Sequence, residues 1–362
     1  MSTFVDNRTP FSTELFSFPD SQGQEIAVLV LSAAFVFDQN GNVFTLDPQP
    51  PVRIADEHFG DPASTSIRYE SDTALYKPWV DVILNGSAYA PRGKAISTLI
   101  ASLEIADIHK ELLVLGDRKK LISGVHSRPT PFQQMPICYE RAYGGCDVSS
   151  SDPKHHKIFT QNPVGFGYCG VRSIHTDIES QLPNIEYADP QSKFAKKIPA
   201  GFGAVARSWS PRRELAGTYD DNWLENQWPL LPTDFNDRHC QAAPLDQQSR
   251  RLCGGEVVRL RNLTPEGEWR FLLPTLDVPV RLFFHDGMEA TRTSLDTVLI
   301  EPDQRQVTLS YRLRLPVQRK RPLREIVLGH MTPGWVLART RGKRFVDLKH
   351  RQGVATHRET FQ

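Results

Sequence analysis

Carboxylates, an imidazole and a thiol gather in one short stretch of the chain, at Asp234, Asp237, His239 and Cys240. These are the side-chain groups that bind zinc and related metals in proteins. A metal shell needs three or four such ligands at one point, and no second cluster in the sequence completes this one. We therefore predict that the protein holds no metal.

Two glycine pairs, Gly144-Gly145 and Gly165-x-Gly167, could cradle a phosphate with their backbone N–H groups. A phosphate loop follows a strand and opens a helix, and neither pair is placed in that way. The acidic pair Asp220-Asp221 is better explained by a helix N-terminus, where the helix dipole favours carboxylates, than by acid–base catalysis. Because the sequence also lacks the hydrolase, metalloprotease and phosphate-loop motifs, we predict no enzymatic activity and no cofactor.

Aromatic residues and glycines interleave between Pro136 and Gly170. Large rings beside backbone that can adopt positive φ favour loops that fold back and pack. We interpret this stretch as a packed corner of the fold, with an ion pair between Glu140 and Arg141, and keep a partner-binding site as the alternative. The candidate residues, with Trp223 added from further along the chain, are Tyr139, Glu140, Arg141, Tyr143, Gly144, Gly145, Asn162, Pro163, Gly165, Phe166, Gly167, Tyr168 and Trp223. We call 139–145 and 162–168 the signature corner.

The two motifs of this corner resemble the signature of a bacterial family, domain of unknown function 2169. Further matches in the same order cover most of the chain: Ser71-Asp72, Lys77-Pro78, Asp81-Val82, Gly86-Ser87-Ala88-Tyr89-Ala90-Pro91, Gly116-Asp117-Arg118, Gly217-Thr218-Tyr219-Asp220 with Trp223, Pro232-Thr233-Asp234-Phe235-Asn236 and Gly254-Gly255-Glu256. The sequence past Pro316 carries no motif of the family.

Members of this family are regarded as adaptors or chaperones encoded beside type VI secretion effectors. The resemblance implies that the chain binds a cognate effector, a toxin, and helps to load it onto the VgrG/PAAR spike of the secretion apparatus. The candidate residues of the signature corner would then belong to the common fold or to the partner surface.

Strand patterns dominate the sequence. The apolar run from Ile26 to Phe37 predicts a buried strand, and alternation from Val307 to Leu315 predicts a strand with Thr308, Ser310, Arg312 and Arg314 outward. Turn signals predict three hairpins: 35–37 with 43–44, 112–115 with 119–122, and 281–284 followed by Asp286-Gly287. We predict an all-β, mainly antiparallel, sandwich-like fold with long loops rich in aromatic residues, glycine and proline.

Helical patterns are few. The clearest runs from Asp220 to Trp228, and a short turn is predicted at Leu323 to Leu328. We divide the chain into one β-rich body, residues 1–316, and a C-terminal annex, residues 317–362. Within the body, a strand block to about residue 121 and a second block from about 250 to 316 are bridged by the loop-rich segment 122–249.

Charge is unevenly distributed although the net charge is only +1. From Arg312 to Gln362 there are 13 basic and 3 acidic residues, which leaves a net charge of −9 on the rest of the chain. A basic annex can neutralise an acidic body by folding onto it, or it can bind nucleic acid. We expect the first, and the nucleic-acid reading stays as an alternative.

The N-terminus shows no secretory signal, and the apolar run of 12 residues at 26–37 is too short to span a bilayer. The five cysteines form no Cys-x-x-Cys motif and are odd in number, which argues against a disulfide framework. We expect a cytoplasmic protein with no membrane insertion. Its predicted function is that of a non-enzymatic effector adaptor, and the alternatives are a nucleic-acid-binding protein and a structural accessory protein of the secretion apparatus.

Overall fold

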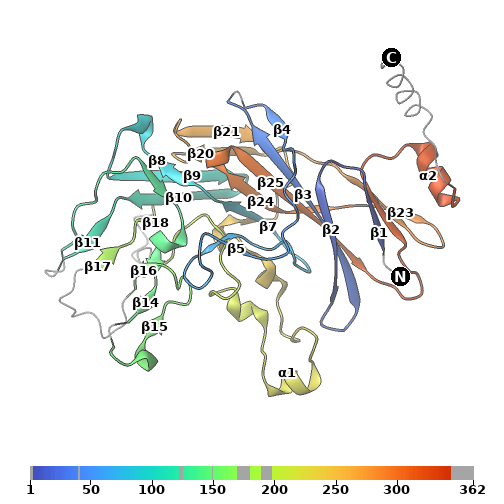
Figure 1. Ribbon diagram of the computed structural model, residues 1–362, viewed down its shortest axis with the longest axis horizontal. Coiled ribbons are helices and arrows are strands. Elements are labelled where there is room, and N and C mark those ends of the chain that lie inside the picture. Colours follow the sequence, from blue (N-terminus) through green and yellow to red (C-terminus); the bar gives the residue numbers. More distant parts are fainter. Residues whose placement is uncertain are drawn as a thin grey trace, which may run out of the picture. The chain divides into compact units, whose positions relative to one another are not determined.

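The computed structural model describes residues 3–39, 41–121, 125–148, 150–168, 180–188 and 198–343. Its contacts divide the chain into two compact units. The larger unit comprises Phe11–Leu276 and Ser294–Pro316, and the smaller comprises Met1–Pro10, Asp277–Thr293 and Val317–Gln362. The fold is mostly β with few helices, as predicted (Figure 1).

A seven-stranded sheet forms the centre of the larger unit. Its strands in spatial order are β19 (Gln248–Ser249), β7 (Val80–Leu84), β24 (Ser294–Glu301), β25 (Gln306–Pro316), β3 (Glu25–Phe37) and β2 (Ser12–Pro19), with β4 (Val43–Thr45) paired to β3. All neighbours are antiparallel except β7 and β24. β3 is buried along nearly its whole length, which confirms the buried strand, and its pairing with β4 confirms the first hairpin.

A five-stranded antiparallel sheet is the second layer of this unit. Its order is β18 (Ile185–Tyr187), β10 (Ile108–Leu115), β9 (Thr98–Ile105), β20 (Val257–Arg261) and β21 (Glu268–Leu272). The ring of Phe37 on β3 lies 5.5 Å from that of Trp269 and 4.8 Å from that of Phe271 on β21. The two sheets therefore share apolar contacts, as the layers of a sandwich do.

The alternating strand was predicted with one solvent face, and this was wrong for its first half. Thr308, Ser310 and Arg312 on β25 are all buried. The loop after β6 (Ile67–Tyr69) covers that face: Ser310 donates to Asp72, and Arg312 donates to the carbonyls of Asp72 and Ala74. A polar residue can point into a protein when another segment supplies its hydrogen bonds.

The second predicted hairpin does not form. β10 pairs with β9 and β18, whereas β11 (Arg118–Lys120) pairs with β17 (Ser180–Leu182). Gly116 between them allows a close approach of backbone instead, since a Cβ there would lie 1.7 Å from the carbonyl oxygen of Thr130. The chain therefore changes direction at Gly116 without forming a two-residue hairpin turn.

Short ladders and helical turns complete the larger unit. The ladders are β5 (Glu57–His58) with β6, β8 (Ser87–Tyr89) with β12 (Gln134–Pro136), β13 (Tyr143–Gly144) with β16 (Phe166–Gly167), and β14 (Cys146–Asp147) with β15 (Lys157–Ile158). The helix is α1 (Asp221–Asn226), and the 3₁₀ turns are η1 (Pro91–Gly93), η2 (Tyr139–Arg141), η3 (Pro153–His155), η6 (Arg213–Ala216), η7 (Asp237–Cys240), η8 (Leu245–Gln247) and η9 (Pro302–Gln304). α1 confirms the predicted helix in shorter form.

The smaller unit is a four-stranded sheet with one helix. Its strands in order are β1 (Phe4–Asn7), β26 (Glu325–Leu328), β22 (Pro279–Phe283) and β23 (Met288–Arg292), and its helix is α2 (Pro333–Thr340). Pairing of β22 with β23 confirms the third hairpin. The helical turn predicted at 323–328 was wrong, because β26 has a strand partner on both sides.

The described part of the basic annex, 317–343, groups with residues from the chain's start and from 277–293. Arg321 donates to Asp286 and to Glu289, and Arg339 donates to Glu325. Acidic partners within its own unit thus neutralise part of the annex.

The single body predicted for residues 1–316 stays a prediction. Among the described residues, no helix is both long and apolar enough to cross a membrane.

Candidate functional site

The two motifs of the signature corner meet in space. β13 and β16 form a short parallel ladder in which Tyr143 faces Phe166. Asn162, fully buried, donates from Nδ2 to the carbonyls of Tyr139 (2.8 Å) and Tyr143 (3.1 Å). The backbone N–H of Gly145 donates to the carbonyl of Asn162 at 2.8 Å. The structure thus brings most of the predicted residues of this corner together, from two segments of the chain.

The glycines of the corner are accounted for by this close approach. A Cβ on Gly145, where φ is +101°, would lie 2.3 Å from the carbonyl oxygen of Gly165. A Cβ on Gly165 would lie 2.4 Å from the carbonyl oxygen of Ala142. The N–H groups of Gly145 and Gly165 already donate to the backbone carbonyl and to Oδ1 of Asn162, so neither is open to a phosphate.

The aromatic rings of the corner form two groups. Tyr139 is buried, with its ring edge-on to Trp209 at 5.5 Å and its hydroxyl donating to the carbonyl of Gly203. Tyr143 and Tyr168 contact Phe159, at 5.2 and 5.1 Å between ring centres, and are half-buried. Phe166 and Pro163 are half-buried too. Rings that pack on one another in this way stiffen a loop.

Glu140 and Arg141 do not form the predicted pair with each other. Glu140 accepts hydrogen bonds from the backbone N–H and the hydroxyl of Ser66. Arg141 lies 3.5 Å from the carboxylate of Asp117 and donates to Asn184. Neighbours in sequence along a 3₁₀ turn point in different directions, and each of these two therefore ties the corner to a different loop.

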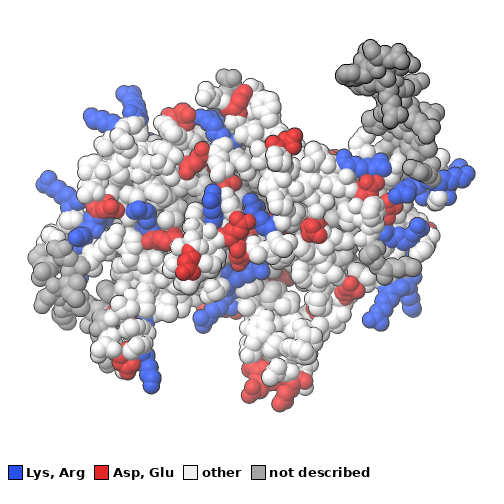
Figure 2. Space-filling model, in the orientation of Figure 1, with Lys and Arg blue, Asp and Glu red and all other residues white. Residues whose placement is uncertain are grey.

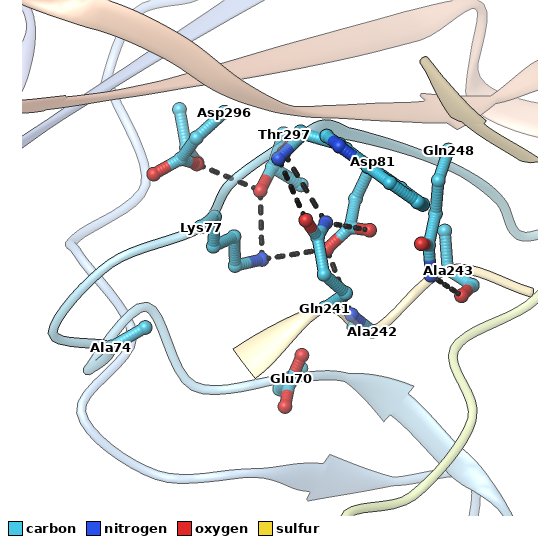
Figure 3. Close-up of polar contacts among 12 residues, drawn as sticks. Glu70, Ala74, Lys77, Asp81, Gln241, Ala242, Ala243, Gln248, Asp296 and Thr297 are labelled. Atoms are coloured by element: carbon cyan, nitrogen blue, oxygen red, sulfur yellow. Dashed lines mark hydrogen bonds and ion pairs between the residues drawn. The ribbon is translucent and has the colours of Figure 1, made fainter. Parts of the chain in front are cut away.

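A buried polar network joins β7 and β24 of the large sheet to neighbouring loops (Figure 3). Lys77 Nζ lies 2.9 Å from Oδ2 of Asp81 and 3.0 Å from the hydroxyl of Thr297. Gln241 donates to the other oxygen of Asp81 at 2.7 Å. Burial opposes charge on Lys77, but Asp81, Asp296 and Glu70 more than offset it and raise its pKa. The network therefore links strands of the sheet to neighbouring loops through a charged pair and its hydrogen bonds.

Two arginines meet a single buried carboxylate beside this network. Arg212 and Arg207 donate to Oε1 of Glu70 at 2.6 and 2.8 Å. Burial opposes ionisation of Glu70, but Arg212, Lys77 and Arg207 outweigh it and lower its pKa. Arg212 also donates to the carbonyl of His239, whose Nδ1 contacts the carbonyl of Arg212 at 2.9 Å.

The residues considered as metal ligands are used in other ways. His239 belongs to the arginine cluster, and Asp234 accepts from the backbone N–H and hydroxyl of Thr218 at 2.9 and 2.8 Å. Within the ranges that the structure describes, no three His, Cys, Asp or Glu side chains are grouped as a metal would require. These side chains serve as supports of the neighbouring loops.

A cavity of about 470 Å³ that was not predicted from the sequence lies beside Tyr139. Its lining includes Tyr187, Pro244, Leu245 and Asp246. Behind Asp246, the buried Nζ of Lys110 donates to that carboxylate at 2.8 Å, and burial lowers the pKa of Lys110. The cavity is of a size that takes a few apolar side chains or a small ligand. Its walls come from segments far apart in sequence, so no local pattern could have indicated it.

Trp223, the last predicted residue, lies on a different part of the larger unit. We call residues 217–234 the α1 arm, whose helix lies apart from the sheets in Figure 1. Asp220 caps the helix by accepting from Trp223 N, and Trp223 Nε1 donates to the carbonyl of Leu230 at 3.0 Å. The Tyr219 ring packs on Trp223 at 4.7 Å. A cap, an indole bond and a ring contact thus fix the arm's shape.

The α1 arm is fixed at its base as well. Gln227 Nε2 donates to the carbonyls of Ser21 (2.9 Å) and Leu231 (3.1 Å). Gly217 has φ of +87°, and a Cβ there would lie 2.8 Å from Asp234 Oδ1. Despite these restraints the arm leaves large apolar side chains in solvent: Tyr219 is 54%, Leu224 59% and Trp228 64% exposed. These exposed apolar side chains on a fixed support make the arm a candidate interaction surface.

The geometry defines a predominantly antiparallel β protein in which the strongest sequence motifs hold loops together and a braced arm displays apolar side chains. The chain belongs to the bacterial family described as "uncharacterized protein conserved in bacteria" (DUF2169), which matches residues 22–312. The match includes the signature corner and the α1 arm. No curated protein and no solved structure matches the chain.

Proposed function

We propose that this protein is a non-enzymatic adaptor that binds a cognate effector of a type VI secretion system in the cytoplasm. It would stabilise that effector and promote its loading onto the VgrG/PAAR spike. The observation that carries the proposal is the α1 arm, where Tyr219, Leu224 and Trp228 are exposed on a segment fixed by hydrogen bonds. Aromatic and aliphatic anchors on a preorganised support are what protein interfaces use as their energetic centre.

The signature corner supports the same proposal indirectly. Its glycines, Asn162 and Tyr139 are occupied by packing and backbone hydrogen bonds. In a family built on such a corner, the corner maintains the common fold, and surfaces such as the α1 arm are left to bind partners.

Co-purification of the full chain from its native cell, followed by mass spectrometry, tests this function. We expect one toxin-like protein or a spike component to be retained at moderate salt, since buried anchors hold a complex while charge mainly steers its formation. Deletion of the gene should lower the level or delivery of one effector and leave the secretion apparatus working. Recovery of nucleic acid with no such protein would overturn the proposal.

Two alternatives are decided by the same experiment. The exposed basic residues of the annex, among them Arg319, Lys320 and Lys343, favour nucleic-acid binding, which would show steep loss of retained nucleic acid with salt. A structural accessory protein would instead be needed for the whole apparatus, so its deletion would stop delivery of every effector.

A further inference from the structure

One face of the α1 arm combines apolar and acidic side chains. Asp221, Leu224 and Glu225 stand at positions i, i+3 and i+4 of α1, which project from the same side of a helix, and Trp228 follows just after the helix ends at Asn226. All four are exposed. The opposite side is occupied, because Trp223 and Gln227 direct their hydrogen bonds to Leu230 and to Ser21.

All the charged side chains of the α1 arm are acidic. Residues 217–234 contain four carboxylates and no lysine or arginine. Asp220 and Asp234 bond to the arm's own backbone, which leaves Asp221 and Glu225 to face solvent beside Leu224 and Trp228. Figure 2 shows acidic side chains gathered at the tip of the arm. Such a surface repels phosphate and attracts lysine and arginine.

We propose that the α1 arm binds a segment of a protein partner in which apolar side chains are flanked by lysine or arginine. The apolar side chains would cover Leu224 and Trp228, and the basic ones would pair with Asp221 and Glu225. An apolar anchor gives affinity, and the charges around it select a partner of the opposite charge. The inference rests on the proposed function only in taking the partner to be a protein.

The test uses the full chain and two defined probes. One is a labelled amphipathic peptide of leucine and lysine, and the other is the same peptide with glutamate in place of lysine. We expect the leucine–lysine peptide to bind at least about tenfold more tightly than the leucine–glutamate peptide, because the glutamates of the second peptide would be repelled by the carboxylates of the arm. Raising the salt concentration should narrow that difference, because exposed charges are screened.

Two double variants separate the contributions of the face. Leu224→Ser with Trp228→Ser should weaken binding of the leucine–lysine peptide by at least about tenfold, as for loss of interface anchors. Asp221→Lys with Glu225→Lys should reverse the preference between the two peptides. Matched controls elsewhere on the larger unit are Ile54→Ser, which removes a side chain that is 71% exposed, and Glu14→Lys. All the variants should keep the melting temperature, since they change exposed side chains.

Equal binding of the leucine–lysine peptide by the wild type and both arm variants would overturn the inference. So would equal affinity for the two peptides. Failure here is distinguishable from failure of the proposed function. If the native effector co-purifies equally with the wild type and the arm variants, the adaptor role stands and the arm assignment falls. If the peptides behave as expected and no effector co-purifies with the wild type, the binding preference of the arm stands and the adaptor role falls.

Discussion

Asn162 Nδ2 donates a hydrogen bond of 2.8 Å to the backbone carbonyl of Tyr139, at the start of the other motif of the signature corner. The same nitrogen reaches the carbonyl of Tyr143 at 3.1 Å, and Oδ1 of Asn162 accepts from the N–H of Gly165. One side chain thus bonds to three backbone groups, which explains why an amide is placed here. Neither a carboxylate nor a hydrocarbon offers both donor and acceptor atoms.

Replacing Asn162 with alanine should therefore destabilise the protein. The carbonyl of Tyr143 and the N–H of Gly165 lose this partner, whereas the carbonyl of Tyr139 keeps the N–H of Ala142 at 3.1 Å, and each group left unsatisfied costs about 1–3 kcal/mol. We expect a loss of roughly 2–4 kcal/mol in the free energy of unfolding, measured by urea titration. Gln161→Ala, one residue earlier and exposed, is the control and should change stability by less than about 0.5 kcal/mol. A small effect at both positions would show that water replaces the amide.

The ion pair of Lys77 and Asp81 should be costly to break from one side. Both side chains are buried, and Lys77→Met would leave the Asp81 carboxylate without its cation. Loss of one partner of a buried pair typically costs about 3–5 kcal/mol. Thermal and urea unfolding of Lys77→Met should show this loss, whereas Lys94→Met, at an exposed lysine, should unfold like the wild type. Unchanged stability of Lys77→Met would mean that Gln241 and the N–H of Ala242 suffice to hold the charge.

His239 should make stability depend on pH. Burial, with the nearby charges of Arg212 and Arg207, lowers its pKa below the ordinary value of about 6.5, although Glu70 and the bond to the Arg212 carbonyl act in the other direction. Since the unfolded state then binds the proton first, stability should fall as the pH drops below about 6.5. The melting temperature of the wild type should fall more between pH 7.5 and 5.5 than that of His239→Gln. Equal decreases in the melting temperatures of the wild type and His239→Gln would mean that other groups cause the pH dependence.

How much the sequence could predict is seen by comparing β3 with β25. The run of β3 is apolar on both faces, so its burial could be predicted from residue types alone. β25 alternates apolar and polar residues, yet Thr308, Ser310 and Arg312 are buried, and Asp72 in a distant segment supplies hydrogen-bond partners to Ser310 and Arg312. An alternating pattern predicts a strand whose successive side chains point to opposite faces, but it does not predict which other segment covers each face.

The candidate site divides in the same way. The signature corner could be located from its rings and glycines, but the partners of Glu140 and Arg141 could not, because they lie on loops distant in sequence. Tyr143, Phe166 and Tyr168 lie in the corner that we interpreted as packed but are only half-buried, so truncating any one of them to alanine should cost less than the roughly 3–5 kcal/mol of a core aromatic. Trp223 was identified, whereas the exposure of Leu224 and Trp228 beside it follows from tertiary structure alone.

The indole bond of Trp223 to the carbonyl of Leu230 should keep the α1 arm in the shape that a partner meets. Trp223→Phe keeps a ring against Tyr219 but removes the donor, a loss of about 0.5–1.5 kcal/mol confined to the arm. Local opening then becomes more frequent while global stability hardly changes. We expect faster amide hydrogen exchange across residues 223–231, an unchanged melting temperature, and weaker binding of the leucine–lysine peptide, since an arm that must be ordered on binding loses affinity.

Trp228→Phe provides the matched control. Trp228 is 64% exposed and has no hydrogen bond from its indole in the described structure, so the same replacement should leave amide exchange in the arm unchanged. Because phenylalanine remains a large apolar side chain, peptide binding should weaken only slightly. If amide exchange in Trp223→Phe were no faster than in Trp228→Phe, the other restraints, among them Gln227 and Asp234, would suffice to hold the arm, and the exposure of Leu224 and Trp228 would not depend on the Trp223 indole bond.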